Sequence, residues 1–95
     1  MRVVWFKRAI LDLIEVRDFI AQDSPNAARQ IVQRIHKKVL LLSEQPNIGK
    51  VGRVATTREL IVDRTAYILP YRVRDNKIEI LRVLHTSRQW SKKIL

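Results

Sequence analysis

The sequence predicts a small two-layer α+β domain, in which a helical hairpin packs on one face of a β-sheet. Between residues 9 and 45, two stretches carry apolar residues at helical spacing. From residue 58 onward the spacing changes to the alternation that is typical of strands, interrupted by turn-forming residues. A chain of 95 residues has room for one hydrophobic core, so residues 1–95 are expected to form a single domain.

Composition and charge exclude several classes of function. The chain has no cysteine, which excludes disulfides, thiolate metal sites and thiol nucleophiles and favours the cytoplasm. His36 and His85 lie on different predicted elements without a second ligand nearby, so we expect neither a metal site nor a cofactor. No segment resembles a secretory signal or a membrane span. The net charge of +10 implies an acidic or polyanionic partner.

The N-terminal half begins with a short apolar run, Arg2 to Phe6, which predicts a strand whose partner the sequence does not indicate. A first helix is predicted over residues 9–22. Its start is weakly marked, because basic residues occupy the capping positions. The expected buried stripe of this helix is Ala9, Ile10, Leu13, Val16 and Ile20, and the expected outer face carries Arg8, Asp12, Glu15 and Gln22.

A second helix is predicted from Asp23 or Ser24 as the N-cap and Pro25 at the first helical position. It ends before Pro46. Its expected buried stripe is Ala28, Ile31, Val32, Ile35, Val39 and Leu42, and its basic outer face is interpreted as solvated. The segment PNIGKVGRVATT, residues 46–57, reads as a loop. It is not a phosphate-binding loop, because no helix follows its glycines.

The C-terminal half predicts a three-strand meander over residues 58–62, 66–73 and 77–85. Asp75 and Asn76 suit a two-residue type I′ turn, since both tolerate a positive φ. This turn fixes the register of the last two strands. The predicted pairs are Val73–Ile78, Arg72–Glu79, Tyr71–Ile80, Pro70–Leu81, Leu69–Arg82, Ile68–Val83, Tyr67–Leu84 and Ala66–His85. Pro70 has no amide to donate, so a bulge or an unpaired position is expected there.

The register divides the side chains between two faces. The expected core face carries Tyr67, Leu69, Tyr71, Val73, Ile78, Ile80 and Leu84, with Arg82 as its only charged member. The other face carries Ile68, Leu81 and Val83 together with Arg72, Glu79 and His85. This second face is apolar in the middle and polar at its ends, which suggests a partly open working surface.

Several motifs resemble the RelE/ParE superfamily of toxins from type II toxin–antitoxin modules. They are an AxxDLxxVxxFI first helix, SPNAA, PxxG, RELIV, YILPYRV, IEILRVLH and a closing RxW, and together they cover nearly the whole chain. The resemblance implies the same α+β fold. It also implies an acidic antitoxin as partner, with a homodimer or a hetero-oligomer as possible assemblies.

The resemblance leaves the target open. RelE-like members are ribosome-dependent mRNA endonucleases, and ParE-like members poison DNA gyrase. In the RelE pattern an arginine follows the tyrosine near the start of the third strand, and a tyrosine lies near the C-terminus. Here Ile68 follows Tyr67 and the aromatic residue of the tail is Trp90, so the sequence is more similar to ParE.

Two alternatives to a ParE-like toxin remain open, a RelE-like nuclease and a nucleic-acid-binding module. A nuclease needs an acid, a base and positive charge on the phosphate, which His85 with Arg58, Arg72 and Arg88 would supply, although a lone histidine at a strand end is more often structural. A non-toxic nucleic-acid-binding module is a third reading, but such modules usually display aromatic residues on an open sheet face. The residues expected to contact the antitoxin or the target are Arg53, Arg58, Arg72, Arg82, His85, Arg88 and Trp90.

Overall fold

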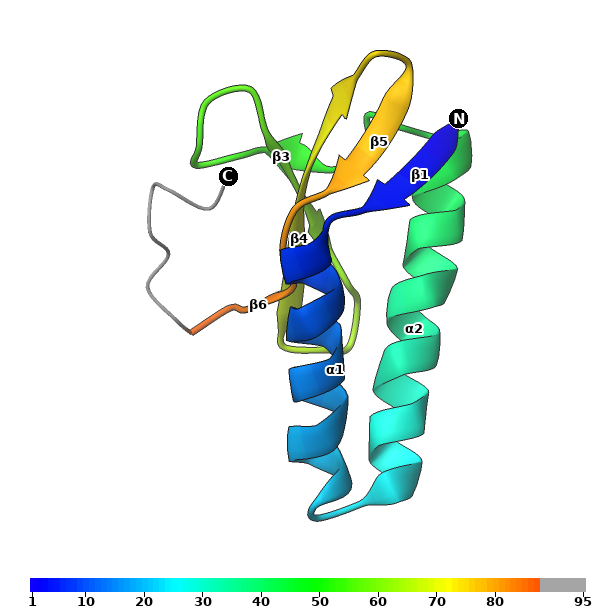
Figure 1. The fold of residues 1–95 in the computed structure, drawn as a ribbon, viewed down its shortest axis with the longest axis vertical. Coiled ribbons are helices and arrows are strands. Elements are labelled where there is room, and N and C mark those ends of the chain that lie inside the picture. Colours follow the sequence, from blue (N-terminus) through cyan, green and yellow to red (C-terminus); the bar gives the residue numbers. More distant parts are fainter. Residues whose placement is uncertain (88–95) are drawn as a thin grey trace.

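The computed structural model describes residues 1–87 and has the predicted α+β arrangement of a sheet covered on one face by a helical hairpin (Figure 1). In chain order the elements are β1 (Arg2–Trp5), α1 (Lys7–Ala21), α2 (Pro25–Glu44), β2 (Lys50–Val51), β3 (Arg58–Ile61), β4 (Tyr67–Arg74), β5 (Lys77–Ile80) and β6 (Leu84–His85). The order of N-terminal strand, helical hairpin and strands is confirmed. Arg88 and Trp90 of the sequence prediction lie outside the described residues.

The two helices begin and end close to the predicted boundaries. The side chain of Ser24 accepts a hydrogen bond from the Ala27 amide at 3.1 Å, so Ser24 is the N-cap of α2, with Pro25 at its first position. Helix α1 starts two residues earlier than predicted, at Lys7, and has no side-chain cap. Its Ile10 was expected in the buried stripe but is 45 % exposed, because α1 buries only a narrow face.

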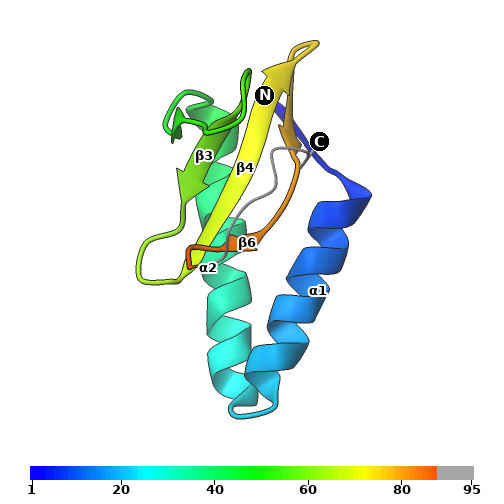
Figure 2. The same cartoon turned by 90° about the vertical axis from the view of Figure 1, so that its left-hand side faces the viewer.

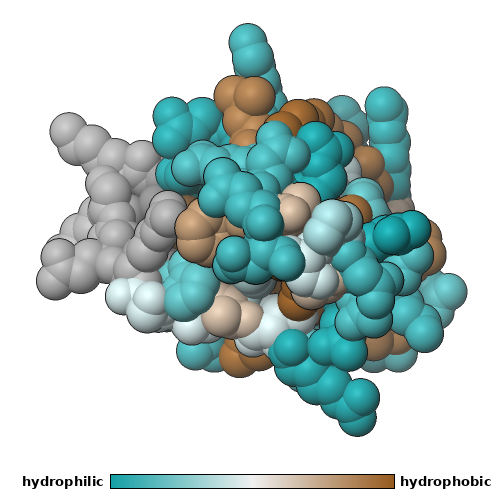
Figure 3. Space-filling view, turned by 90° about the horizontal axis from the view of Figure 1, so that it is seen from below, coloured by the Kyte–Doolittle hydropathy of each residue, from teal (hydrophilic) through white to brown (hydrophobic). Residues whose placement is uncertain are grey.

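The helices lie on one face of the sheet and extend beyond it, so that the turn between them projects past the end of β4 (Figures 1 and 2). At this projecting end, hydrophobic residues lie in separate spots among hydrophilic ones (Figure 3). The core between the layers contains Ala9, Ile35, Val39, Leu42, Leu60, Val62, Leu69, Tyr71, Ile78, Ile80 and Val83.

The sheet has the strand order β1-β5-β4-β3-β2 within residues 1–87, and β6 pairs with Tyr67 and Ile68 at the start of β4. β1 runs parallel to β5, with Val3 opposite Ile78. This pairing was not predicted, because nothing local in the sequence specifies a parallel partner. The short β2 lies within the predicted loop, where Lys50 pairs with Glu59 on β3.

The hairpin between β4 and β5 has the predicted register. Val73 lies opposite Ile78 and Tyr71 lies opposite Ile80. The turn residues Asp75 and Asn76 have φ values of 53° and 59°, as a type I′ turn requires. The local pattern of two φ-tolerant residues between alternating strands was therefore sufficient to predict this part of the sheet.

Beyond Ile80 the predicted continuous third strand is wrong. The Leu81 amide donates to the Pro70 carbonyl at 2.9 Å, but Pro70 has no amide to return the bond, and β5 ends. When pairing resumes in β6, His85 lies opposite Tyr67 in place of Leu84. The break predicted at Pro70 is confirmed. The one-residue shift makes the predicted pairs Ile68–Val83, Tyr67–Leu84 and Ala66–His85 wrong, and Leu69–Arg82 falls in the break.

The shift also changes which side chains face the helices. Val83 is buried in the core, although it was expected on the opposite face, and the partly exposed Leu84 is not part of the core. Val73 is 43 % exposed near the hairpin tip. The second face is less open than predicted, since Ile68 and Leu81 are only 5 % and 1 % exposed.

Candidate functional site

A groove of about 540 Å³ lies between α1 and β6, and we call it the α1–β6 groove. Its lining includes Leu11, Ile14, Glu15 and Phe19 of α1 and Tyr67, Arg82, Leu84 and His85. Phe19 is 67 % exposed, so the helix presents apolar surface that the core does not use. Two residues predicted to bind a partner, Arg82 and His85, meet at this groove.

Arg82 reaches the groove because residues 81–83 leave the sheet. Its guanidinium donates to both carboxylate oxygens of Asp12, at 2.7 and 3.2 Å, and the Val83 amide donates to Asp12 at 3.0 Å. Asp12 was predicted on the outer face of α1, but its side chain is only 12 % exposed and joins α1 to the strand break. A two-bond pair of this kind fixes both side chains. The main role of Arg82 is therefore structural, since its guanidinium joins the strand break to α1 through Asp12.

His85 is held by its own neighbours. Its Nδ1 accepts a hydrogen bond from the Ser87 amide at 3.1 Å and contacts the Ser87 hydroxyl at 2.7 Å. Its ring meets Tyr67 edge to face, with 5.4 Å between the ring centroids. Since Nδ1 accepts, these contacts favour the tautomer that carries the proton on Nε2. Within residues 1–87 no carboxylate bonds to His85, so nothing there orients it as a general base.

Arg58 holds the loop that follows α2. Its guanidinium donates to the carbonyls of Gly49 at 2.8 Å and Asn47 at 3.4 Å. The neighbouring Tyr71 hydroxyl accepts from the Gly49 amide at 2.9 Å and donates to the Pro46 carbonyl at 2.7 Å. Burial raises the pKa of the Tyr71 phenol, and the Gly49 amide and the Arg58 charge partly oppose this increase.

Arg72 lies on the other face of β4. Its Nε donates to Glu79 on β5, and its guanidinium lies 5.7 Å from the ring centre of Phe6. Arg74 contacts the second oxygen of Glu79 at 3.4 Å. The hydrogen bond from Arg72 lowers the pKa of Glu79 below its usual value. The Arg72 side chain is only 15 % exposed, which limits what it offers to a partner.

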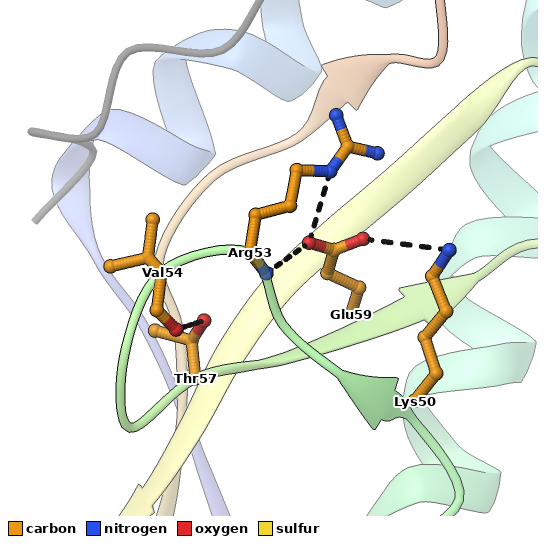
Figure 4. A network of polar contacts seen from close by, with 5 residues as sticks. All are labelled: Lys50, Arg53, Val54, Thr57 and Glu59. Carbon is orange, nitrogen blue, oxygen red and sulfur yellow. Dashed lines mark hydrogen bonds and ion pairs between the residues drawn. The ribbon is translucent and has the colours of Figure 1, made fainter.

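Arg53 and Lys50 surround a buried carboxylate (Figure 4). Glu59 is 1 % exposed, and one of its oxygens accepts from the Arg53 amide at 2.9 Å and lies 3.3 Å from the Arg53 Nε. Lys50 lies 3.9 Å from the other oxygen. This arrangement fastens the loop between β2 and β3 onto the sheet. The Arg53 side chain remains 48 % exposed, so it still presents charge to solvent.

Of the candidate catalytic residues, the structure describes His85, Arg58 and Arg72, and it does not bring these three together. Arg58 lies opposite Tyr71 and His85 opposite Tyr67, which separates them by about 13 Å along β4 at the rise of a strand. Arg72 follows Tyr71 in β4 and so faces the other side of the sheet from Arg58. Arg82 shares the α1–β6 groove with His85, but its guanidinium is already bonded to both carboxylate oxygens of Asp12.

The apolar wall of the α1–β6 groove was missed by the sequence reasoning. Leu11, Ile14 and Phe19 fall outside the predicted buried stripe of α1, and no role was assigned to them. An excess of large apolar residues on a surface helix was the available signal. Two further features were sought in residues 1–87. They hold no cluster of metal-binding side chains, and no helix among them has the length and apolar character for a bilayer crossing.

Comparison with known proteins identifies relatives along nearly the whole chain. A family model described as the ParE toxin of the type II toxin–antitoxin system parDE matches residues 3–90. The Sinorhizobium fredii protein Y4kP, described only as a candidate toxin, is 42 % identical, covering 94 % of this chain and 92 % of its own. Toxin RelE2 of Caulobacter vibrioides is 39 % identical, covering 92 % and 97 %. A structure titled as the chromosomal ParDE TA system from P. aeruginosa matches with a TM-score of 0.81 and 28 % identity, covering 92 % and 97 %.

Proposed function

Because the chain belongs to the ParE toxin family of type II toxin–antitoxin systems, we propose that it arrests growth by poisoning DNA gyrase. A cognate acidic antitoxin neutralises it in the cytoplasm. The chain is then an inhibitor of an enzyme and not itself an enzyme. This reading accounts for a charge of +10 without requiring a catalytic site.

The observation that carries the proposal is the separation of the candidate nuclease residues that the structure describes. Cleavage by attack of a 2′-hydroxyl needs an acid or base within hydrogen-bond reach of the phosphate and a cation beside it. His85 and Arg58 are about 13 Å apart along β4 by the strand rise. In addition, the residue after Tyr67 is Ile68, which is 5 % exposed and uncharged, where the RelE pattern has an arginine.

Partner contacts are proposed for the predicted residues that keep accessible surface. His85 lines the α1–β6 groove, and Arg53 is half exposed at the loop before β3. The guanidinium groups of three other predicted residues already bond within the protein: Arg58 to the Gly49 carbonyl, Arg72 to Glu79 and Arg82 to Asp12. These residues are proposed to support the contacts indirectly, by holding the loop and strands in place. The free toxin is expected to form a homodimer or, with the antitoxin, a hetero-oligomer.

Induction of the toxin in cells without the antitoxin tests the proposal. Poisoned gyrase leaves broken DNA, so a DNA-damage reporter should respond and cells should form filaments while protein synthesis continues at first. With purified components, the protein should increase gyrase-dependent cleavage of supercoiled DNA. Arrest of protein synthesis in the first sampled minutes, together with transcripts cut inside codons, would instead make the protein a ribosome-dependent nuclease.

The variant His85→Asn separates the two functions more sharply than an alanine. The asparagine carboxamide oxygen can accept from the Ser87 amide where Nδ1 does, but it cannot transfer a proton at neutral pH. Under the proposal this variant still arrests growth, because the carboxamide keeps a polar surface in the groove and no proton transfer is required. A folded His85→Asn protein that cleaved ribosome-bound mRNA 10²-fold or more slowly than the wild type would indicate acid–base catalysis.

A further inference from the structure

A second groove, on the other flank of the molecule, differs from the α1–β6 groove in its charge. It has a volume of about 530 Å³ and lies between α2 and the turn joining β3 to β4, and we call it the α2 groove. Its basic lining residues are Arg34, Lys37, Lys38 and Arg64, and its acidic ones are Glu44 and Asp63. Four cations against two carboxylates leave a formal charge of +2. The groove therefore attracts an acidic ligand.

Apolar surface accompanies this charge. Leu40 and Leu41 line the α2 groove and are 67 % and 40 % exposed, and the buried Val62 lines its sheet side. Exposed leucines would contribute nothing to a surface that binds only nucleic-acid phosphates, because such a surface binds through charge and hydrogen bonds. Leucines beside lysines instead match a peptide that carries both acidic and apolar side chains.

The wall opposite α2 is held in place by specific contacts. Arg34 donates to the Arg64 carbonyl at 3.2 Å, and Lys38 lies 3.2 Å from the Asp63 carboxylate. Arg64 has a φ of 63°, a left-handed conformation that a residue with a side chain adopts only when its surroundings hold it there. The Thr65 hydroxyl donates to the Val62 carbonyl at 2.8 Å and stabilises the turn from within. The α2 groove is thus a formed surface before any partner arrives.

The open edge of β3 adjoins the turn of this groove. β2 pairs only with Arg58 and Glu59, so within residues 1–87 no strand covers Ile61. The Val62 amide bonds to β4, and because bonding alternates along a strand, the amide and carbonyl of Ile61 point away from the sheet. A peptide passing the turn in an extended conformation can pair with this edge.

We propose that the α2 groove binds an acidic segment with apolar side chains, in which carboxylates meet Lys37 and its basic neighbours and an apolar residue covers Leu40. The inference rests on the proposed function in naming the antitoxin as the source of this segment. The α1–β6 groove does not suit the same ligand, because Glu15 and Asp18 lie in its lining. The α2 groove thus favours an acidic ligand, and the acidic lining of the α1–β6 groove disfavours one.

A pair of charge reversals on one helix tests the site. Lys37 lines the groove, is exposed and has no ion pair among the described residues, whereas Arg29 is also exposed on α2 but does not line the groove. Lys37→Glu and Arg29→Glu change the net charge equally. Titration of purified toxin with the antitoxin encoded beside it, followed by calorimetry, should show that Lys37→Glu weakens binding at least tenfold and Arg29→Glu less than threefold. Equal effects of the two variants would refute a localised site.

A matched apolar pair separates a peptide from a nucleic acid. Leu40→Ser and Phe19→Ser each remove a side chain that is 67 % exposed, so neither should disturb the fold. The proposal expects weaker antitoxin binding for Leu40→Ser alone. If Leu40→Ser binds antitoxin as the wild type does while Lys37→Glu loses affinity for a DNA duplex, the groove is a phosphate-binding surface and the proposal is wrong.

Growth assays keep the two proposals distinguishable. Lys37→Glu expressed alone should arrest growth as the wild type does, and coexpressed antitoxin should fail to restore growth. Rescue of Lys37→Glu as complete as that of the wild type would contradict the groove while leaving the toxin function intact. A wild-type protein that causes no arrest would contradict the function, whereas a loss of antitoxin binding confined to Lys37→Glu and Leu40→Ser would still support the groove.

Discussion

Removal of one hydroxyl group, in the variant Tyr71→Phe, should destabilise the whole domain. Tyr71 is fully buried in the core, and its hydroxyl joins the loop after α2 to the sheet by accepting from the Gly49 amide and donating to the Pro46 carbonyl. Phenylalanine keeps the ring and its packing. The change therefore isolates the two hydrogen bonds from the apolar contribution of the side chain.

Each intramolecular hydrogen bond contributes about 0.5–1.5 kcal/mol net, so the expected loss in the free energy of unfolding is about 1–3 kcal/mol. In a domain of 60–100 residues, each kcal/mol lowers the melting temperature by about 4–8 °C. A central loss of about 2 kcal/mol thus corresponds to roughly 8–16 °C. Urea unfolding followed by circular dichroism measures the free energy directly.

Tyr67→Phe is the matched control, since the Tyr67 hydroxyl makes no hydrogen bond within the described part of the chain and its ring is half-buried. The control should lose less than about 0.5 kcal/mol, as substitutions away from buried polar contacts usually do. Equal losses for Tyr71→Phe and Tyr67→Phe would refute the assigned role of the Tyr71 hydroxyl.

The pH dependence provides a second readout of the same group. Burial raises the pKa of Tyr71 above its ordinary value of 10.0, so the unfolded chain releases this proton before the folded protein does. The stabilising contribution of the phenol is present below pH 10 and is lost as the pH rises through the folded pKa. The stability difference between the wild type and Tyr71→Phe should therefore shrink above pH 10. A difference that grows there would contradict the burial argument.

Three further variants test other contacts. Gly49→Ala would place a methyl group 2.5 Å from a carbon of the buried phenol ring and should cost about 1–3 kcal/mol in urea unfolding; unchanged stability would show that the loop yields freely. A double-mutant cycle of Asp12→Ala with Arg82→Ala should give a coupling energy of about 0.5–3 kcal/mol, and strict additivity would deny that their ion pair stabilises the fold. Arg72→Met should lower stability at neutral pH but progressively less as the pH falls below 4.5, the ordinary value for Glu79, whose lowered pKa contributes stability only while the carboxylate is charged. A constant difference down to acid pH would count against that pairing.

The parts of the fold that were predictable from sequence are specified locally. Ser24 and Pro25 mark the start of α2, and Asp75 and Asn76 are the residues that a two-residue turn needs. Such signals act within a few residues. They were sufficient for the helical hairpin and for the register from Val73 to Tyr71.

The remaining strand pairings depend on contacts between distant residues. The parallel pairing of β1 with β5 joins residues more than seventy positions apart, such as Val3 and Ile78, and leaves no local pattern in the sequence. The one-residue shift before β6 has a local cause in Pro70, but its size depends on where Arg82 and the Val83 amide reach Asp12 on α1. A register extended from the turn alone has no access to that contact.

The same limit applies to the candidate site. Sequence reasoning selected basic residues by type, and Arg82 and His85 do lie at one groove. It did not identify which cations the fold itself engages, because the acidic partner of Arg82 is 70 positions away in the chain. From sequence the basic face of α2 was interpreted as solvated. In the structure this face is one wall of a groove, because the turn at Arg64 lies opposite it, and the sequence of α2 contains no sign of that turn.

The interruption of the sheet at Pro70 separates the pairing of β4 with β5 from its pairing with β6, so the two ladders should open independently. The β4–β5 hairpin is a regular ladder of four residue pairs, whereas β6 is joined to β4 by only two. Opening of β6 breaks few bonds and leaves the hairpin intact, so its amides should exchange with solvent hydrogen through a local fluctuation, while those of β5 exchange only on global unfolding. The short strand β6, which carries His85, can thus rearrange around a partner at little cost to the stability of the core.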